Sequence, residues 1–119
     1  MIKIVMLVRR KDGISREAFR EHYENIHAPL AMSVLPTLRA YTRNYPEMHL
    51  VGQEPGFDAV TELWFDDEAS WQESIAVAQS EKGKALAEDE ETFIDRAATV
   101  AMVARECRSD ISWSDRRTP

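Results

Sequence analysis

The sequence predicts a single α+β domain in which helices cover one face of an antiparallel sheet. The chain has 119 residues, of which 44% are hydrophobic and 30% charged, and this is the length and composition of one globular domain. The predicted elements follow the order strand, helix, strand, strand, helix, strand. This βαββαβ order is typical of the split βαβ, ferredoxin-like arrangement. We expect residues 1–106 to form the domain and residues 107–119 to form a polar C-terminal tail that carries Trp113.

The first strand is predicted at residues 2–8, IKIVMLV, which are apolar at alternating positions on both faces. A turn at residues 9–13 follows. Ser15 is the predicted N-cap of the first helix. One apolar stripe recurs along this helix at helical spacing and should face the sheet, formed by Phe19, Tyr23, Ile26 and Leu30.

A break or kink is predicted near the end of the first helix, at His27-Ala28. Pro29 lacks an N–H group and disfavours helical dihedral angles at the preceding residue. Backbone polar groups would then be freed beside the imidazole of His27, at a half-buried edge of the apolar stripe. His22 lies at the other edge and is interpreted as a surface or packing residue.

The second and third strands are predicted at residues 37–45 and 57–65, joined by a loop at 46–56 with two prolines and two glycines. Pairing around this loop would place Asn44 near Asp58, and Ala40 near Glu62. The third strand has two distinct faces, and its acidic residues share the one that also carries Val60 and Trp64.

Residues 66–97 are predicted to be helical, with a cap at Asp66 or Asp67 and a division near Gly83. The acidic run 89–91 in this region is interpreted as a solvated helix face. The fourth strand, residues 98–106, is apolar on both faces, like the first. Because two helices cover only one face of a sheet, the other face needs a partner, and the pattern predicts a homodimer whose sheets pack face to face.

The composition argues against several classes of function. A formal net charge of −6 argues against nucleic acid as a partner, and no apolar run approaches the roughly 20 residues that span a membrane. Cys107 is the only cysteine, and the simplest inference is a protein of the reduced cytoplasm. Residues 1–8 are interpreted as a strand and not as a signal peptide. No metal-ligand spacing and no phosphate-binding glycine motif occurs, so we expect neither a metal nor a cofactor. Haem ligation by His27 remains a weakly supported alternative.

The stretch KIVMLVRRKDGISREAFREHYENIHAPLAMSVL resembles the opening of the EthD-like family, within the dimeric α/β-barrel superfamily. The resemblance continues through LRAYTRNY, FDAVTELWFDD and EDEETFID, and HAPL after the F…HY helix is its most specific part. It implies the ferredoxin-like fold and a dimer with two packed sheets, a dimeric α/β barrel. It also makes one acidic residue of the 89–91 run a candidate pocket residue. Members of this superfamily resemble one another in fold more than in chemistry, which includes isomerases, dehydratases, decarboxylases, cyclases, haem-degrading enzymes and cofactor-free monooxygenases.

Two functions are consistent with these residues. The first is a cofactor-independent enzyme, lyase- or isomerase-like or oxygenase-associated, that acts on an oxygenated, partly hydrophobic catabolic or polyketide-like molecule. His27 would be its acid/base catalyst, because an imidazole exchanges protons near neutral pH and the strand carboxylates Asp58 and Glu62 could orient it. The second is a non-catalytic small-molecule-binding or accessory dimer for an oxidative degradation pathway. His49 is interpreted as a solvated loop residue, with a lid as the alternative. The candidate substrate-binding residues are Tyr23, Tyr41, Asn44, Asp58, Glu62 and Trp64.

Overall fold

The computed structural model describes residues 1–112, so Trp113 and the rest of the expected tail lie outside the described residues. The predicted order of elements is confirmed, and each helical region consists of more than one piece. In chain order the elements are β1 (Ile2–Val8), α1 (Arg16–His22), a π-helical turn (Tyr23–His27), α2 (Ala28–Val34), β2 (Ala40–Asn44), β3 (Ala59–Phe65), α3 (Glu68–Ala78), a 3₁₀ turn (Glu81–Gly83), α4 (Lys84–Phe93) and β4 (Val100–Ala104).

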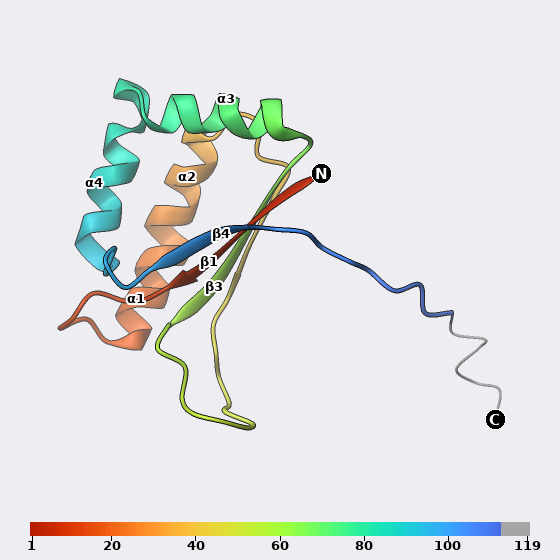
Figure 1. Cartoon of the computed structure of the whole chain (residues 1–119). Helices are drawn as coiled ribbons and strands as arrows, with labels where there is room; N and C mark the ends of the chain where they lie inside the picture. Colours follow the sequence, from red (N-terminus) through yellow and green to blue (C-terminus); the bar gives the residue numbers. More distant parts are fainter. Residues whose placement is uncertain (113–119) are drawn as a thin grey trace.

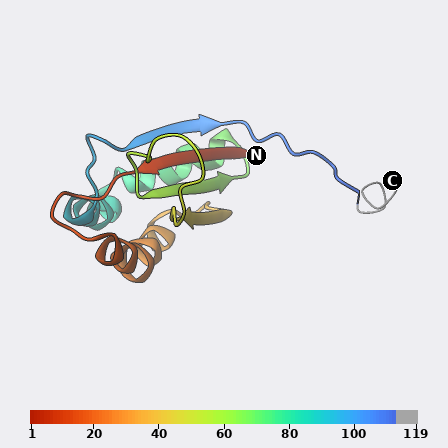
Figure 2. The same ribbon diagram turned by 90° about the horizontal axis from the view of Figure 1, so that it is seen from below.

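The four strands form one antiparallel sheet in the order β2-β3-β1-β4. All the described helices lie on one side of this sheet, and its other side is bare (Figure 1). Figure 2 shows the strands side by side, with β1 and β3 in the middle and β4 and β2 at the two edges. This is the predicted α+β, ferredoxin-like fold.

The pairing of β2 with β3 differs from the expected register by two residues. Asn44 pairs with Val60, and Ala40 pairs with Trp64. Asp58 precedes β3, its N–H donates to the Val8 carbonyl of β1 at 2.7 Å, and the pairing with β2 begins at Val60. The loop is therefore longer than predicted, and Asp58 belongs to it.

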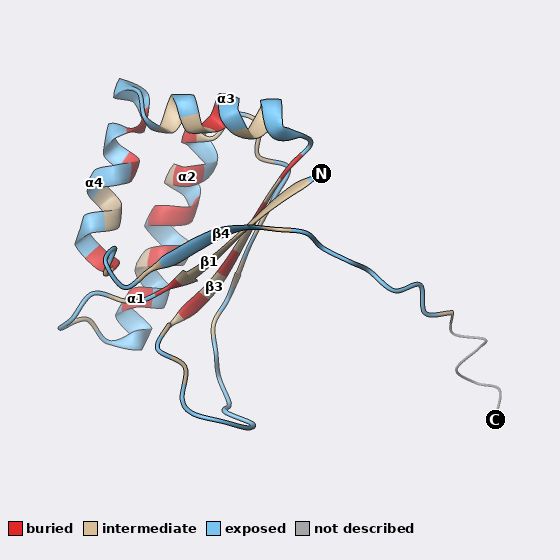
Figure 3. Ribbon diagram, in the orientation of Figure 1, coloured by how far each residue is buried: buried red, intermediate tan, exposed pale blue. Residues whose placement is uncertain are grey.

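The core lies between the helices and one face of the sheet (Figure 3). Aromatic rings pack edge to face at its centre, with ring centroids 5.7 Å apart for Phe19 and Tyr23 and 5.4 Å apart for Tyr23 and Phe93. Each of these side chains is at most 2% exposed. Burial of one such side chain is worth about 1.5–3 kcal/mol, so this cluster holds α1 and α4 onto β1 and β3.

The opposite face, which we call the outer sheet face, is apolar around a charged centre. Its apolar members are Val5, Leu7, Val60, Trp64, Val100 and Met102, whose positions alternate with the helix-facing ones along each strand. Lys3 Nζ lies 2.5 Å from Glu62 Oε2, and Asn44 donates to the same carboxylate at 3.2 Å. Val100 and Met102 are 50% and 42% exposed, because none of the described helices covers this face.

The helix does not break at His27-Ala28, and the irregularity there is a π-helical turn over Tyr23–His27. Ala28 has helical dihedral angles (φ −63°, ψ −45°), and its N–H donates to the Tyr23 carbonyl five residues earlier. This π-helical turn admits one extra residue, so Pro29 begins α2 where its missing N–H is tolerated. The extra residue also rotates the helix face: Ile26, expected in the apolar stripe, is 51% exposed, whereas His27 is 4% exposed and not half-buried.

The second helical region divides near Gly83, as predicted. Asp67 caps α3 by accepting a hydrogen bond from the Ser70 N–H at 2.8 Å. A Cβ atom on Gly83 would lie 1.8 Å from the Ala78 carbonyl oxygen, so only glycine fits where the chain turns from α3 into α4. Within residues 1–112, no helix is long and apolar enough to cross a membrane.

Candidate functional site

Two histidines of the first helical region bond to one carboxylate on α4. The His27 Nδ1 atom lies 2.8 Å from Asp89 Oδ2, and the His22 Nε2 atom lies 2.9 Å and 3.1 Å from the two Asp89 oxygens. Both imidazoles also pack against the Phe93 ring, with centroid separations of 4.5 Å and 4.9 Å. We call this group, with the adjacent Glu90, the His–Asp cluster.

The π-helical turn brings the two histidines together. In a regular α-helix, residues five apart point about 140° away from each other, since each residue turns the chain by about 100°. The extra residue in the turn at Tyr23–His27 relates His22 and His27 roughly as residues four apart, on one face. Single π turns are common at functional sites, and this one places both imidazoles on the helix face that contacts Asp89.

The proton positions in this cluster follow from the chemistry of its members. An ionised carboxylate only accepts hydrogen bonds. His27 Nδ1 therefore carries a hydrogen atom, and this N–H group donates a hydrogen bond to Asp89. In the neutral imidazole, Nε2 then keeps its lone pair. Nε2 lies 3.9 Å from Glu90 Oε1, too far for a direct hydrogen bond, and one oxygen atom of a bound molecule can contact both groups.

Glu90 is the second titratable group beside His27 Nε2. Burial raises the pKa of its carboxyl above the ordinary value, and the nearby His27 and Arg96 charges oppose this shift only in part. A carboxyl group with a raised pKa can hold a proton that it later gives up. The His–Asp cluster therefore combines a candidate base and a candidate acid.

Glu90 also lines an open depression of about 580 Å³ between α3 and α4. Basic residues at this depression are Lys84 and Arg96, and Arg96 Nε lies 3.8 Å from Glu90 Oε2. Lys84 forms no ion pair with the residues that the structure describes. Glu81 is a second acidic residue of the lining, so Glu90 lies between His27 and a surface that carries apolar residues and charges of both signs. The apolar lining consists of Ile75, Ala78, Leu86 and Ala87.

Tyr23 and Tyr41, two of the predicted substrate-binding residues, lie on the same side of the sheet as His27. The Tyr23 hydroxyl and Thr61 Oγ1 are 2.6 Å apart, and the Tyr23 ring lies edge-on to His27 at 5.5 Å between centroids. Burial raises the pKa of the Tyr23 phenol, and it raises the pKa of Tyr41 as well. Both phenols therefore stay protonated at neutral pH and can only donate or accept hydrogen bonds.

The other predicted residues lie elsewhere. Asn44, Glu62 and Trp64 lie on the outer sheet face, with the sheet between them and His27. Asp58 lies at the end of the sheet, where it accepts from the Arg10 N–H at 2.9 Å. The expectation that Asp58 or Glu62 orients His27 is wrong, because both carboxylates bond to basic residues nearby and Asp89 takes that role. Their part in substrate binding stays a prediction.

From the residues alone, the sequence analysis assigned Asp89 and Glu90 to a solvated helix face, and it did not predict the partnership of His22. Leu86 and Phe93, seven residues apart on α4, are both buried. Residues 89 and 90 lie one helical turn from each of them and must share their face, so the run is not fully solvated. The spacing of Leu86 and Phe93 was the signal in the sequence that residues 89 and 90 face the core. In the sequence analysis, only the resemblance of EDEETFID to the family indicated a pocket residue there.

Pro29→Ala is expected to loosen the His–Asp cluster without unfolding the domain. Alanine restores an N–H at this position, so the π-helical turn can relax to a regular α-helix and turn His27 away from Asp89. We expect the free energy of unfolding to rise by about 1–3 kcal/mol or stay unchanged. Thermal unfolding and the nitrogen chemical shifts of the His27 imidazole measure the two effects.

Pro36→Ala is the matched control, because Pro36 is an exposed proline beyond the end of α2. Unchanged imidazole shifts in Pro29→Ala would show that the π-helical turn does not depend on the proline.

Glu90→Gln is expected to change how stability depends on pH. Because the pKa of Glu90 is raised in the folded protein, the unfolded chain loses this proton first as pH rises. The native protein should therefore lose stability relative to Glu90→Gln from about pH 4.5 up to the raised pKa, and the difference should stay constant above it. Urea unfolding at several pH values measures this. Glu91→Gln, on the exposed neighbour, is the control, and an equal pH dependence there would contradict the assignment.

Comparisons with known proteins agree with this fold. The EthD domain family matches residues 11–97. An EthD family protein from Bacillus halodurans is 27% identical over 90% of this chain and all of that chain, with a TM-score of 0.64. An Arabidopsis thaliana protein is 16% identical over 93% of this chain and all of that one (TM-score 0.67). A dimeric ferredoxin-like protein of unknown function from Thermobifida fusca is 18% identical over 87% of this chain and 88% of that one (TM-score 0.60).

No curated protein is significantly similar to this chain. The family match covers most of the βαββαβ unit, including the π-helical turn, His27 and the Asp89–Glu90 pair. The resemblance seen in the sequence is thereby confirmed, and the chain belongs to the EthD domain family.

Proposed function

We propose that this protein is a cofactor-independent enzyme that transfers protons on a small, oxygenated, partly hydrophobic molecule. The observation that carries the proposal is the arrangement at His27. Its Nδ1–H is held by Asp89 at 2.8 Å, and its Nε2 lies 3.9 Å from the Glu90 carboxyl, whose pKa is raised. Imidazole–carboxylate pairs of this kind fix the tautomer and stabilise the imidazolium that forms on proton uptake.

The division of roles follows from this geometry. His27 Nε2 takes a proton from the substrate, and Asp89 stabilises the resulting positive charge. Glu90 donates its proton to an oxygen or carbon of the same molecule. Isomerisation and dehydration each require such a pair of proton transfers, and decarboxylation of a carboxylate requires only the proton that replaces the departing CO2. The reaction therefore belongs to the lyase or isomerase type.

The depression between α3 and α4 supports the substrate class. Its apolar residues suit a hydrocarbon or ring portion, and Lys84 and Arg96 suit a carboxylate or another oxygen-rich end. A substrate in this position reaches His27 past the Glu90 side chain. The substrate is therefore oxygenated at the end that reacts and apolar beyond it.

The outer sheet face supports a homodimer. It presents six apolar side chains that none of the described helices covers. The Thermobifida fusca protein, which is similar in fold, is described as dimeric. Two copies with these faces packed together would bury Trp64 and Met102, together with the Lys3–Glu62 pair. The active site would then lie on the far side of each sheet, one in each subunit.

Proton exchange in D2O tests the proposed chemistry. A muconolactone, a β-keto acid and a β-hydroxy ketone represent isomerisation, decarboxylation and dehydration, and proton NMR follows their acidic C–H groups. At least one compound should exchange or react with the native protein, and His27→Gln should lower its rate by about 10²- to 10⁴-fold. Equal rates for the native protein and the variant would contradict the proposal.

One observation favours the alternative of a binding or accessory dimer: His27 is only 4% exposed, as a purely structural histidine would be. The two functions differ in what His27→Gln does. In a binding protein, glutamine preserves ligand affinity and there is no rate to lose. In the enzyme, glutamine can form hydrogen bonds but cannot exchange a proton at neutral pH, so binding persists while turnover fails.

A further inference from the structure

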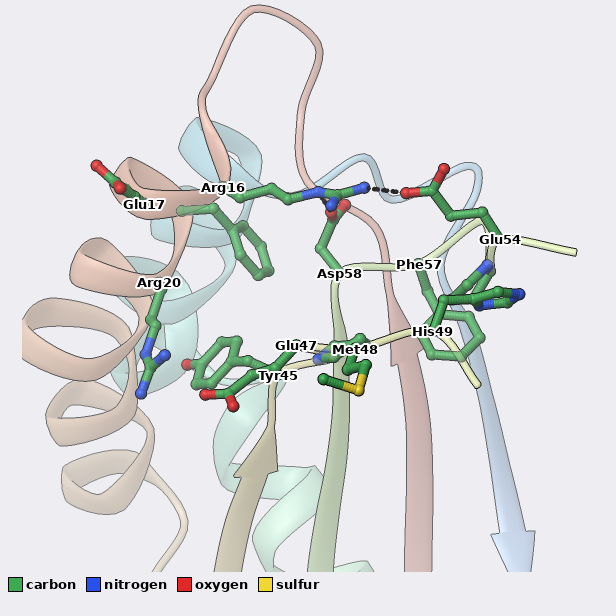
Figure 4. A pocket seen from close by; sticks show the side chains of 13 residues that line it. Arg16, Glu17, Arg20, Tyr45, Glu47, Met48, His49, Glu54, Phe57 and Asp58 are labelled. Atoms are coloured by element: carbon green, nitrogen blue, oxygen red, sulfur yellow. Dashed lines mark hydrogen bonds and ion pairs between the residues drawn. The ribbon is translucent and has the colours of Figure 1, made fainter. Parts of the chain in front are cut away.

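A second cavity, separate from the His–Asp cluster, lies between α1 and the connection from β2 to β3. Its volume is about 300 Å³. The close view shows Arg16 and Glu54 along one side of it, with Tyr45 and Met48 opposite (Figure 4). Phe19 and Phe57 complete the wall, so aromatic rings and a thioether make up most of the apolar surface. None of the cluster residues around His27 lines this cavity.

The aromatic walls are held in place before anything binds. The Tyr45 hydroxyl donates to Glu24 Oε2 at 2.5 Å, and the Tyr45 ring lies edge-on to Phe19 at 6.4 Å between centroids. Phe19 is itself 1% exposed and anchored in the core. The adjacent Asp58 is fixed by Arg10, so that the end of the loop is tied to β1. A preformed apolar wall of this kind loses little entropy when a ligand binds.

The loop is closed over the cavity by one exposed ion pair. Arg16 Nη2 lies 2.8 Å from Glu54 Oε1, and the two side chains are 63% and 70% exposed. Exposed pairs of this kind contribute little to stability, so the loop can open without disturbing the domain. His49 donates to the Gly52 carbonyl at 2.5 Å inside the loop, where Gly52 has a positive φ of 82° that favours glycine.

The charges around the cavity disfavour an anionic ligand. Glu17 and Glu47 add negative charge at the rim, which disfavours an anion. A cation would be drawn to the Tyr45 ring, but the Arg20 guanidinium already stacks there, 5.0 Å from the ring centroid. Glu54 and Asp58 are already paired with Arg16. Glu17 and Glu47 form no ion pair with the described residues, so the charges act against an anion, and the aromatic walls favour an uncharged ring.

We propose that this cavity is a binding site for a small, uncharged aromatic molecule, distinct from the proposed active site. Three aromatic walls favour a flat ring that packs against their faces and edges. The volume is at the lower end of the range for ligand sites, about 300–1,000 Å³, which suits one or two fused rings. The Arg16–Glu54 pair closes the loop over the bound ring.

Methyl NMR of methionine, with indole as the probe, tests this proposal. The chain has five methionines, and Met48 lines the cavity while Met6 and Met102 lie in the sheet. Indole should shift the Met48 methyl signal saturably and leave the other two unchanged. Benzoate, an anion of similar size, should bind at least 10-fold more weakly. Phe57→Ala should weaken indole binding at least 10-fold.

Leu50→Ala is the matched control, since Leu50 lies on the same loop, is 85% exposed and does not line the cavity. It should leave indole affinity unchanged, as should His27→Gln, because the cavity does not depend on the proposed active site. The proposal is overturned if indole shifts all the methionines alike, or if benzoate binds as tightly as indole. If Phe57→Ala fails to fold, the comparison of indole with benzoate on the native protein decides.

Discussion

Asp89→Asn is expected to lower the proton-exchange rate that depends on His27 by about 10²- to 10⁴-fold while the domain stays folded. Two imidazole N–H groups donate to the two oxygens of Asp89. Asparagine replaces one of these oxygens with an NH2 group, which donates and cannot accept. One histidine must then change its tautomer or lose its partner. The negative charge that stabilises an imidazolium is lost in either case.

His22→Asn is the matched control for Asp89→Asn. It removes one of the two donors to Asp89 but leaves the 2.8 Å bond between Asp89 and His27 intact. We expect its exchange rate to stay within about 10-fold of the native rate, because His22 does not hold the proton that moves. Imidazole nitrogen shifts should show Nδ1–H of His27 in this control and an altered tautomer in Asp89→Asn. If both variants lost activity equally, the cluster would act as a structural unit and not as an oriented base.

The fold could be predicted from the sequence because its signals are local. Alternation along residues 2–8 and 98–106 marks strands, Ser15 and Asp67 mark helix starts, and the order of elements has one common solution. The register of β2 against β3 could not be predicted, because a shift of two residues keeps every side chain on the same face of the sheet. The contact of the Asp58 N–H with the Val8 carbonyl at the start of β3 was equally out of reach. That contact joins residues 50 apart and has no local signature.

The site could be predicted only in part, for a related reason. His27 stood out through its place beside Pro29, but a π-helical turn changes the face of every residue that follows it. The expected half-buried rim therefore became a buried position, and Ile26 moved to the surface. The partner of His27 comes from α4, a helix whose docking angle no pattern in the first helix encodes. Tertiary packing decided which of many carboxylates met the imidazole.

Leu7→Asp is expected to convert a homodimer into a monomer and to raise the dissociation constant by at least about 10²-fold. Leu7 lies on the outer sheet face, where it pairs with Val60 on β3 and with Val100 on β4. In a single subunit an aspartate there stays hydrated, so the fold survives. In a face-to-face dimer it becomes a buried carboxylate without a partner, which costs several kcal/mol, and each 1.4 kcal/mol is a factor of about ten in affinity.

Sedimentation velocity across a micromolar concentration series measures this change, and circular dichroism checks that the variant is folded. Val51→Asp introduces the same charge on the loop, at a position 87% exposed and away from the sheet, and should remain as dimeric as the native protein. Val103 is unsuitable for this test because it pairs with Ile4 on the helix-facing side of the sheet and does not lie on the outer sheet face. Leu7 lies on the outer sheet face and Val51 does not. If the two variants had the same dissociation constant, the sheets would not meet at this face. A native protein that sediments as a monomer throughout the series would exclude the face-to-face dimer directly.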